Sequence, residues 1–296
     1  MEYPNIVKLD IEAQKVNKIG NILLASGKIS PEDMARVLEL QENEETLFGD
    51  AAVKLGILNQ EDVEWALASQ FSYPYIKEGE NTFSREVITI YHPFSPQVES
   101  FRSIRSGLVL QGAGQQLKTI AVISPDPGDG RTLIASNLAT VFAQLGSKTL
   151  LLDLNFRGPR VHELFNVKNN CGMSSLIIKR ATLKQAVNPT PVSDLYILPS
   201  GPMPPNPVEL LGWPETRHLM ASLKQSYDII IIDTPSFNKG SDALLIGGLS
   251  DCAILMALKG KTTRESFGVV KKHLDSSGVK VIGSVMNEIH LRRKKI

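Results

Sequence analysis

Apolar runs of strand length alternate with helical stretches over the last two thirds of the chain. Six such runs occur, at residues 119–123, 149–153, 195–198, 229–233, 253–258 and 279–285. Their hydrophobicity is continuous rather than alternating, which is typical of strands that are buried on both faces of a parallel sheet. The pattern predicts an α/β fold, with a mostly parallel sheet flanked by helices. Sheets of this kind bind ligands at the carboxyl ends of their strands.

A different pattern precedes this region, because residues 19–41 and 48–70 resemble each other. In each copy a helical apolar pattern stops at a glycine, and a good N-cap residue then starts a second helix. These residues are Gly27 and Ser30 in the first copy and Gly56 and Asn59 in the second. The repeat predicts a helix–turn–helix unit twice over, which forms a small all-α domain at residues 1–78.

The remaining boundaries follow from polarity and charge. Residues 79–95 are polar and turn-rich, and we expect them to be a linker. Residues 96–290 then form the larger, nucleotide-binding domain, and residues 291–296 are a basic tail. Short charge runs of this kind are usually solvated, so we interpret the tail as a solvated end rather than a binding patch.

Composition narrows the class of protein. The 296 residues include 32 Lys+Arg and 31 Asp+Glu, for a net charge of +1, so we expect no nucleic-acid partner. The two cysteines form no CxxC pair, which argues against a disulfide framework and fits a reducing compartment. The sequence has no apolar stretch near the roughly 20 residues of a bilayer span. It also has no signal-peptide pattern, and we expect a cytoplasmic protein.

Residues 124–132, directly after the first strand of the predicted sheet, have the composition of a phosphate-binding loop. Gly128 and Gly130 can adopt the positive φ that turns successive backbone N–H groups inward, and a helix N-terminus follows them. Thr132 is placed where a hydroxyl would ligate magnesium. Taken alone, however, an ordinary strand-to-helix turn explains this loop about as well.

The loop departs from the pattern G-x-x-x-x-G-K-[ST] at two positions, since Pro125 replaces the first glycine and Arg131 replaces the lysine. Two further strand ends strengthen the prediction. Asp153 and Asp233 each end an apolar strand, where a carboxylate can hold a metal ion or orient a nucleophile. Each aspartate alone could equally be a helix N-cap. Three such features at three strand ends, in this order, predict nucleotide binding.

Together these features resemble the bacterial tyrosine kinases of polysaccharide synthesis, which are P-loop NTPases, over about residues 94–289. The shared motifs include the loop at 124–130, Asp153 with Arg157, the proline-rich segment 201–211 and Asp233-Thr234-Pro235. Asp126 and Pro127 stand where the related cell-division ATPases have a lysine and a glycine. The N-terminal unit resembles the first domain of type II secretion and pilus assembly ATPases.

The resemblance implies an enzyme that uses ATP and Mg²⁺. It implies catalytic roles for Asp153, Arg131 and Asp233, and magnesium ligation by Thr132, Asp153 and Asp233. The implied nucleotide contacts are Asp126, Pro127, Gly128, Asp129, Gly130, Arg131, Thr132, Leu133 and Asn287. The implied oligomerisation motif is Glu99, Arg102 and Arg105, which share one helix face; a plain solvated face is the alternative.

Three departures from the family bear on activity. Arg131 is bulkier and more planar than the lysine it replaces. Asn155 stands where the family has a second acid, and an amide cannot act as a base. The last tyrosine is Tyr227, so the family's tail tyrosines have no counterpart in the sequence. Two alternatives to a kinase therefore remain, a regulatory ATPase switch and a nucleotide-binding scaffold without turnover.

The resemblance also implies partners and a location. The activator would be the cytoplasmic segment of a membrane polysaccharide co-polymerase, which would place a homo-oligomeric kinase at the inner membrane and give it control of exopolysaccharide chain length. Some relatives of the N-terminal unit bind cyclic di-GMP through an arginine in each repeat. Lys18 and Leu47 stand at those positions here, so we favour a protein-docking module over a dinucleotide sensor.

Overall fold

The computed structural model of the chain describes residues 18–70, 83–112 and 117–288. The chain divides into two compact units, one of residues 1–80 and 90–95 and the other of residues 81–89 and 96–296. Within the described ranges, no helix combines the length and the apolar character that crossing a membrane requires. The predicted basic tail, residues 291–296, lies outside the described residues.

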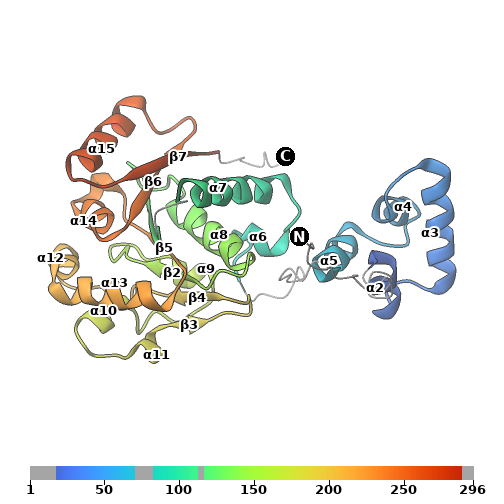
Figure 1. The fold of residues 1–296 in the computed structure, drawn as a ribbon, viewed down its shortest axis with the longest axis horizontal. Helices are drawn as coiled ribbons and strands as arrows, with labels where there is room; N and C mark the ends of the chain where they lie inside the picture. Colours follow the sequence, from blue (N-terminus) through green and yellow to red (C-terminus); the bar gives the residue numbers. More distant parts are fainter. Residues whose placement is uncertain (1–17, 71–82, 113–116, 289–296) are drawn as a thin grey trace, which may run out of the picture. The chain divides into compact units, whose positions relative to one another are not determined.

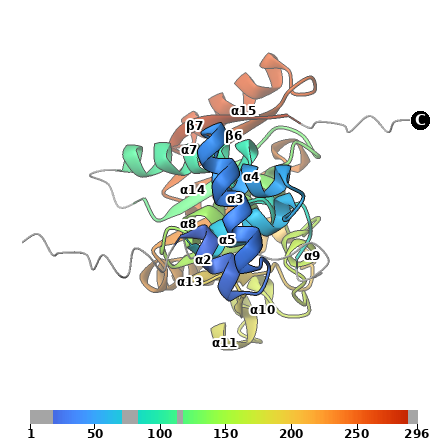
Figure 2. The same ribbon diagram turned by 90° about the vertical axis from the view of Figure 1, so that its right-hand side faces the viewer.

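Residues 18–70 of the first unit form helices in the order that the repeat predicts (Figure 2). They are α2 (Ile19–Ala25), α3 (Pro31–Glu44), α4 (Phe48–Lys54) and α5 (Gln60–Gln70). Helix α2 packs against α5, and α3 packs against α4. Their apolar faces enclose a small core that includes Leu23, Val37 and Ala51.

The residues repeated in the sequence have clear local roles in this unit. The predicted N-caps are confirmed, since the side chain of Ser30 accepts a hydrogen bond from Asp33 N and that of Asn59 accepts one from Asp62 N at 2.8 Å. A Cβ on Gly49 would lie only 2.6 Å from Cγ1 of Val63. Glycine at this position therefore lets two helices of the unit pack closely.

The second unit is built on a seven-stranded sheet with the order β3-β4-β2-β5-β1-β6-β7. The strands are β1 (Thr119–Ile123), β2 (Thr149–Asp153), β3 (Asn188–Pro189), β4 (Leu195–Leu198), β5 (Ile229–Asp233), β6 (Cys252–Leu258) and β7 (Val281–Asn287). All neighbouring strands are parallel except β3, which is antiparallel to β4. The predicted α/β fold with a mostly parallel sheet is confirmed.

Helices cover both faces of the sheet (Figure 1). One face carries α7 (Pro96–Gly112) and α8 (Arg131–Ala143), and α12 (Pro207–Gly212), α13 (Pro214–Ser226), α14 (Asp242–Leu249) and α15 (Arg264–Ser276) cover the other. Shorter helices are α6 (Ile88–Tyr91), α9 (Val161–Leu164), α10 (Met173–Ile177), α11 (Leu183–Ala186) and the 3-10 turn η1 (Phe237–Lys239). Strands β1 and β2 are buried at every position, as continuous hydrophobicity predicts.

Two predictions about strands were wrong in detail. The last strand begins at Val281 rather than residue 279, because Val279 N donates to Leu274 O and its side chain is buried below the end of α15. The two-residue strand β3 was missed, because so short a segment that contains Pro189 carries no strand pattern.

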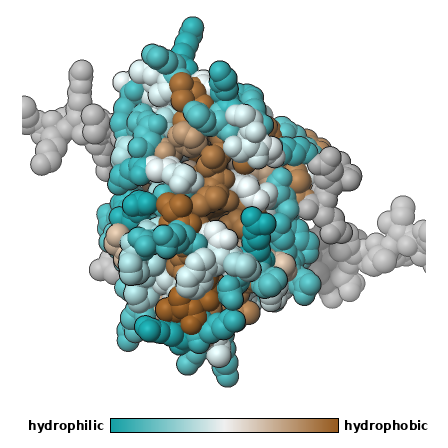
Figure 3. All heavy atoms as spheres, turned by 90° about the vertical axis from the view of Figure 1, so that its left-hand side faces the viewer, coloured by the Kyte–Doolittle hydropathy of each residue, from teal (hydrophilic) through white to brown (hydrophobic). Residues whose placement is uncertain are grey.

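The outer face of α14 and α15 carries a band of apolar side chains (Figure 3). Exposed apolar residues of the helical layer on this side include Val269 and Trp213. A hollow of about 630 Å³ lies beside the proline-rich segment and is lined by Met203, Pro205 and Trp213 among others. None of its lining residues belongs to the predicted nucleotide site.

Candidate active site

Three strand ends meet at one edge of the sheet, because β5 lies between β2 and β1. Strands β2 and β5 are in register, so Asp153 is paired with Asp233. Val122 of β1 stands opposite Asp233 on the other side, and β1 then leads into the loop at 124–130. The sheet thus brings together the loop and the two aspartates that the sequence singled out.

The loop has the backbone conformation that its glycines predict. Gly128 has φ 78° and Gly130 has φ 99°, both in the left-handed region. Gly130 is the N-cap of α8, and a Cβ there would lie 2.3 Å from Nδ2 of Asn287. Asn287, at the end of β7, donates to Asp129 O at 2.9 Å. A substitution at Gly130 would therefore strain the backbone and displace Asn287.

Arg131 is directed into the protein and binds the loop itself. Its Nε donates to Thr234 O at 2.9 Å, and its Nη1 donates to Asp126 O at 2.7 Å and to Ser124 Oγ. The side chain is only 8% exposed. Burial lowers the pKa of the guanidinium, although the negative charge of Asp233 acts in the opposite direction and raises it. Arg131 thus ties the loop to the end of β5, a role that a compact ammonium could not fill with the same contacts.

Asp153 and Asp233 form a buried carboxylate pair beside the first turn of α8. Both side chains are fully buried. Oδ2 of Asp233 accepts a hydrogen bond from Thr132 Oγ1 at 2.7 Å. Burial raises the pKa of Asp233 to about 6, although the Thr132 hydrogen bond and the charge of Arg131 oppose the shift. Burial, and then the neighbouring charge of Asp233, raise the pKa of Asp153 well above its usual value.

The carboxylate of Asp153 is held by backbone amides. Oδ1 accepts from Asn155 N at 2.9 Å, and Oδ2 accepts from Arg160 N and Val161 N, both at 3.2 Å. Asp153 therefore binds backbone N–H groups at the start of α9, but the N-cap residue of that helix is Arg160, so the alternative that Asp153 is a helix N-cap was wrong. The side chain of Asn155 donates to Gly158 O at 2.7 Å and closes the same turn.

The donor set at this edge of the sheet fits magnesium. Mg²⁺ prefers hard oxygen ligands and is usually bound by one or two carboxylates together with phosphate oxygens and water. Oδ1 of Asp233 is buried and has no hydrogen-bond partner among the described residues. An unpaired buried carboxylate oxygen is costly, so a cation at this point would compensate for it. Thr132 and Asp153 supply further oxygen atoms next to it.

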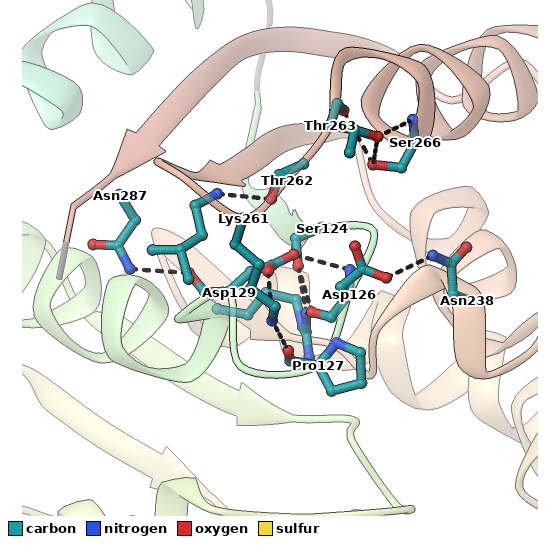
Figure 4. A network of polar contacts seen from close by, with 12 residues as sticks. Ser124, Asp126, Pro127, Asp129, Asn238, Lys261, Thr262, Thr263, Ser266 and Asn287 are labelled. Atoms are coloured by element: carbon teal, nitrogen blue, oxygen red, sulfur yellow. Dashed lines mark hydrogen bonds and ion pairs between the residues drawn. The ribbon is translucent and has the colours of Figure 1, made fainter.

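Two loop contacts were missed by the sequence reasoning (Figure 4). Lys261, from the turn between β6 and α15, binds Pro127 O and lies 3.2 Å from Asp129 Oδ1. Asn238, in η1, donates to Asp126 Oδ1 at 2.8 Å. Both residues are more than a hundred positions from the loop in sequence, and neither lies in a recognisable motif.

Comparison with known proteins places this site in a family. Residues 117–247 match the AAA domain family. The tyrosine-protein kinase YwqD of Bacillus subtilis is 36% identical over 203 residues, which are 69% of this chain and 86% of that protein. The chain belongs to the family of bacterial tyrosine-protein kinases. A putative tyrosine-protein kinase of the same kind, CapB of Staphylococcus aureus, is 34% identical over 197 residues, which are 67% of this chain and 86% of that protein.

Solved structures agree with this assignment. The chimerical protein CapA2B2 aligns with a TM-score of 0.66 at 33% identity, over 76% of this chain and 98% of that one. The kinase domain of the Escherichia coli tyrosine kinase ETK aligns with a TM-score of 0.67 at 27% identity, over 71% of this chain and 82% of that one. The fold is that of a P-loop NTPase, a class whose loop and helix N-terminus bind nucleotide phosphates.

In this kinase-family chain, the predicted oligomerisation residues lie on α7 rather than at the phosphate loop. Glu99 Oε2 and Arg102 Nη1 are 3.2 Å apart. Arg105 Nη1 donates to Val141 O of α8 at 2.7 Å. Arg105 therefore also helps to hold α7 on α8. Leu133, a predicted nucleotide contact, is partly exposed in the first turn of α8.

Proposed function

We propose that the protein transfers the γ-phosphoryl group of ATP, with Mg²⁺, to a tyrosine hydroxyl. The observation that carries the proposal is the buried pair of Asp153 and Asp233, with one unpartnered oxygen, beside Thr132 and a phosphate loop. Phosphoryl transfer needs positioning and charge neutralisation more than covalent help from the protein. When bound, the metal would neutralise charge that develops on the phosphates.

The residues at the site divide the task. Inward-facing amides around Gly128 and Gly130 would bind phosphate oxygens, and Arg131 would hold the loop in that shape and add positive charge. Thr132 and Asp233 would position the magnesium. Asp153 would accept the proton of the tyrosine hydroxyl as the new O–P bond forms and ADP leaves. A raised pKa suits a general base that works near neutral pH.

The assay uses labelled ATP, magnesium and a tyrosine-containing acceptor peptide, with release of phosphate and formation of phosphotyrosine both measured. We expect phosphotyrosine from the wild-type protein and a large loss in Asp153→Asn. Unchanged phosphotransfer in that variant would remove the role given to Asp153. A wild-type protein that forms no phosphotyrosine with any acceptor would contradict the kinase proposal as a whole.

A regulatory ATPase switch is the second candidate, and two observations favour it. The amide of Asn155 is tied to Gly158 O, so it adds no acid to the site. Tyr227, the last tyrosine in the sequence, is only 9% exposed and packs edge-on against Tyr196 at 5.5 Å. Phosphate release without phosphotyrosine, on the protein itself or on a co-expressed partner, would favour the switch. Binding of ATP without any release would favour a scaffold.

We also propose that a membrane polysaccharide co-polymerase activates the enzyme through its cytoplasmic segment, as the resemblance to the tyrosine kinases of polysaccharide synthesis implies. The solved chimerical protein CapA2B2, similar over most of its length, supports testing such a peptide fused to this chain. Stimulation of turnover by the fused peptide is the expected result.

The residues Glu99 and Arg102 of α7 are proposed to hold a homo-oligomer together. The mass of the protein in solution tests this. An oligomer of the wild-type protein that dissociates in the double variant Glu99→Ala, Arg102→Ala would support the role of α7.

The helical repeat unit, residues 1–78, is proposed to dock a protein partner. Lys28 of the first copy lies against Asp62 and over the ring of Trp65 of the second copy, so its charge is already used within the unit. Titration of cyclic di-GMP against the full chain tests the competing role. Tight binding that is lost in Lys18→Ala would overturn the docking proposal.

A further inference from the structure

The phosphate loop has an unfavourable charge for its proposed ligand. Residues 124–132 contain two acids, Asp126 and Asp129, and a single base, Arg131. A loop with an excess of negative charge repels the phosphates of a nucleotide. Arg131 does not relieve this fully, since Nε and Nη1 of its guanidinium are already bound to acceptors of the protein.

The charge of Asp129 is especially unfavourable because its side chain is fully buried under the loop. Its Oδ2 accepts a hydrogen bond from Asp126 N at 2.9 Å. Its Oδ1 lies 3.2 Å from Lys261 Nζ, and the same ammonium binds Pro127 O. A buried carboxylate needs a partner of opposite charge, and Lys261 is the partner that the fold supplies.

The turn that carries Lys261 is held firmly at both ends (Figure 4). Lys261 N donates to Leu258 O at 3.1 Å, and Thr262 Oγ1 accepts from Leu258 N at 2.9 Å. Thr263 caps α15, since its side chain accepts from Ser266 N. The backbone that carries Lys261 is therefore fixed by hydrogen bonds, which directs its ammonium group toward the loop.

We propose that Lys261 is a positioning residue of the phosphate loop: it neutralises Asp129 and fixes Pro127, which makes the loop competent to bind the phosphates of a nucleotide. The inference rests on the proposed function, because it concerns the same nucleotide. The turn between β6 and α15 thus supplies the positive charge for Asp129, because the guanidinium of Arg131 is bound to Thr234 O and Asp126 O. The backbone amides then face the ligand in a loop whose own acid has been compensated.

The test is the affinity of the full chain for ATP, ADP, AMP and adenosine, measured by calorimetry. Lys261→Met should weaken ATP binding by about tenfold, as expected when a buried carboxylate loses its partner of opposite charge. The loss should shrink from ATP to AMP and vanish for adenosine, because it arises from phosphate charge. Lys259→Met is the matched control. Lys259 lies two positions away, is paired with Glu288 instead, and its loss should leave all four affinities unchanged.

Two further variants distinguish neutralisation of Asp129 by Lys261 from direct contact between Lys261 and the nucleotide. Asp129→Asn combined with Lys261→Met removes both charges and should restore most of the ATP affinity. Lys261→Arg should retain it, since the charge remains. Failure of the double variant to recover, an equal loss for adenosine, or wild-type affinity in Lys261→Met would each overturn the inference. A wild-type protein that binds none of the four ligands would instead overturn the proposed function.

Discussion

Two sets of buried carboxylates at one edge of the sheet differ in how their charge is compensated. Asp129 is enclosed by the loop and has both an ammonium and a backbone amide as partners. Asp233 and Asp153 are equally buried, but they stand next to each other, and the charge of Asp233 raises the pKa of Asp153. One oxygen of Asp233 has no partner among the residues that the structure describes.

The difference separates an acid whose charge the fold compensates by itself from the two carboxylates of the proposed nucleotide site. Lys261 and a backbone amide complete the surroundings of Asp129. The surroundings of Asp233 stay incomplete, because its Oδ1 has no hydrogen-bond partner among the described residues, and a bound cation would compensate for this. Buried carboxylates with shifted pKa values are typical of functional sites.

The largest effect is expected from Asp233→Asn. Because Asp233 supplies the unpartnered oxygen, we expect the magnesium-dependent turnover of ATP to fall by about 100-fold or more. Steady-state phosphate release at several magnesium concentrations measures this. Asp228→Asn is the control, since Asp228 lies just before the other end of the same strand and its side chain accepts a hydrogen bond from Lys148 N. An equal loss in both variants would mean that the effect is structural.

The second test uses pH and the stability of the metal-free protein. The folded state keeps the proton of Asp233 up to a pKa of about 6, whereas the unfolded chain loses it near 4. The free energy of unfolding should therefore fall by about 3 kcal/mol through Asp233 as pH rises from about 4 to 6, and the raised pKa of Asp153 should extend the fall to higher pH. Below pH 4 this contribution is fully present.

Denaturant unfolding at pH 4, 5, 6 and 7.5, with and without magnesium, follows that change. Asp233→Asn should be more stable than the wild-type protein at pH 7.5 without magnesium, and the two should converge toward pH 4. A stability difference that does not depend on pH would show that the carboxylate is not a destabilising charge.

The third test removes the hydroxyl that donates to Asp233. Thr132→Ala should raise the magnesium concentration needed for half-maximal turnover by about tenfold. The variant loses both a charge-assisted hydrogen bond to Asp233 and a proposed magnesium ligand. Thr132→Ser keeps the hydroxyl and should stay within about twofold of the wild-type value. If alanine and serine behave alike, the hydroxyl has no part in the site.

The smallest effect is expected from Arg131→Lys. Lysine cannot reproduce the contacts of the guanidinium with Thr234 O and Asp126 O, so the free energy of unfolding should fall by about 1–2 kcal/mol. Nucleotide affinity should change little, since the positive charge remains. Thermal unfolding and nucleotide titration together check this. A large loss of affinity with unchanged stability would mean that Arg131 contacts the ligand more than it holds the loop.

Much of the site could be predicted from the sequence, because its parts are local. Positive φ at Gly128 and Gly130 follows from the loop pattern, and Asp153 and Asp233 follow from apolar strands that end in an acid. The direction of Arg131 could not be predicted in the same way. Whether a long cationic side chain faces a ligand or bonds to its own loop depends on which carbonyls surround it in three dimensions.

The α/β class, the helical repeat and the strand ends with acidic residues can be predicted from the chain alone, because the spacing of apolar residues and the needs of tight turns are local properties. Which strand ends meet depends on the order of the strands in the folded sheet, where β5 lies between β2 and β1. The tertiary structure also decided the partner of Asp129, because Lys261 reaches the loop from β6–α15. A buried charge selects its partner by proximity in space, and the sequence alone does not contain that distance.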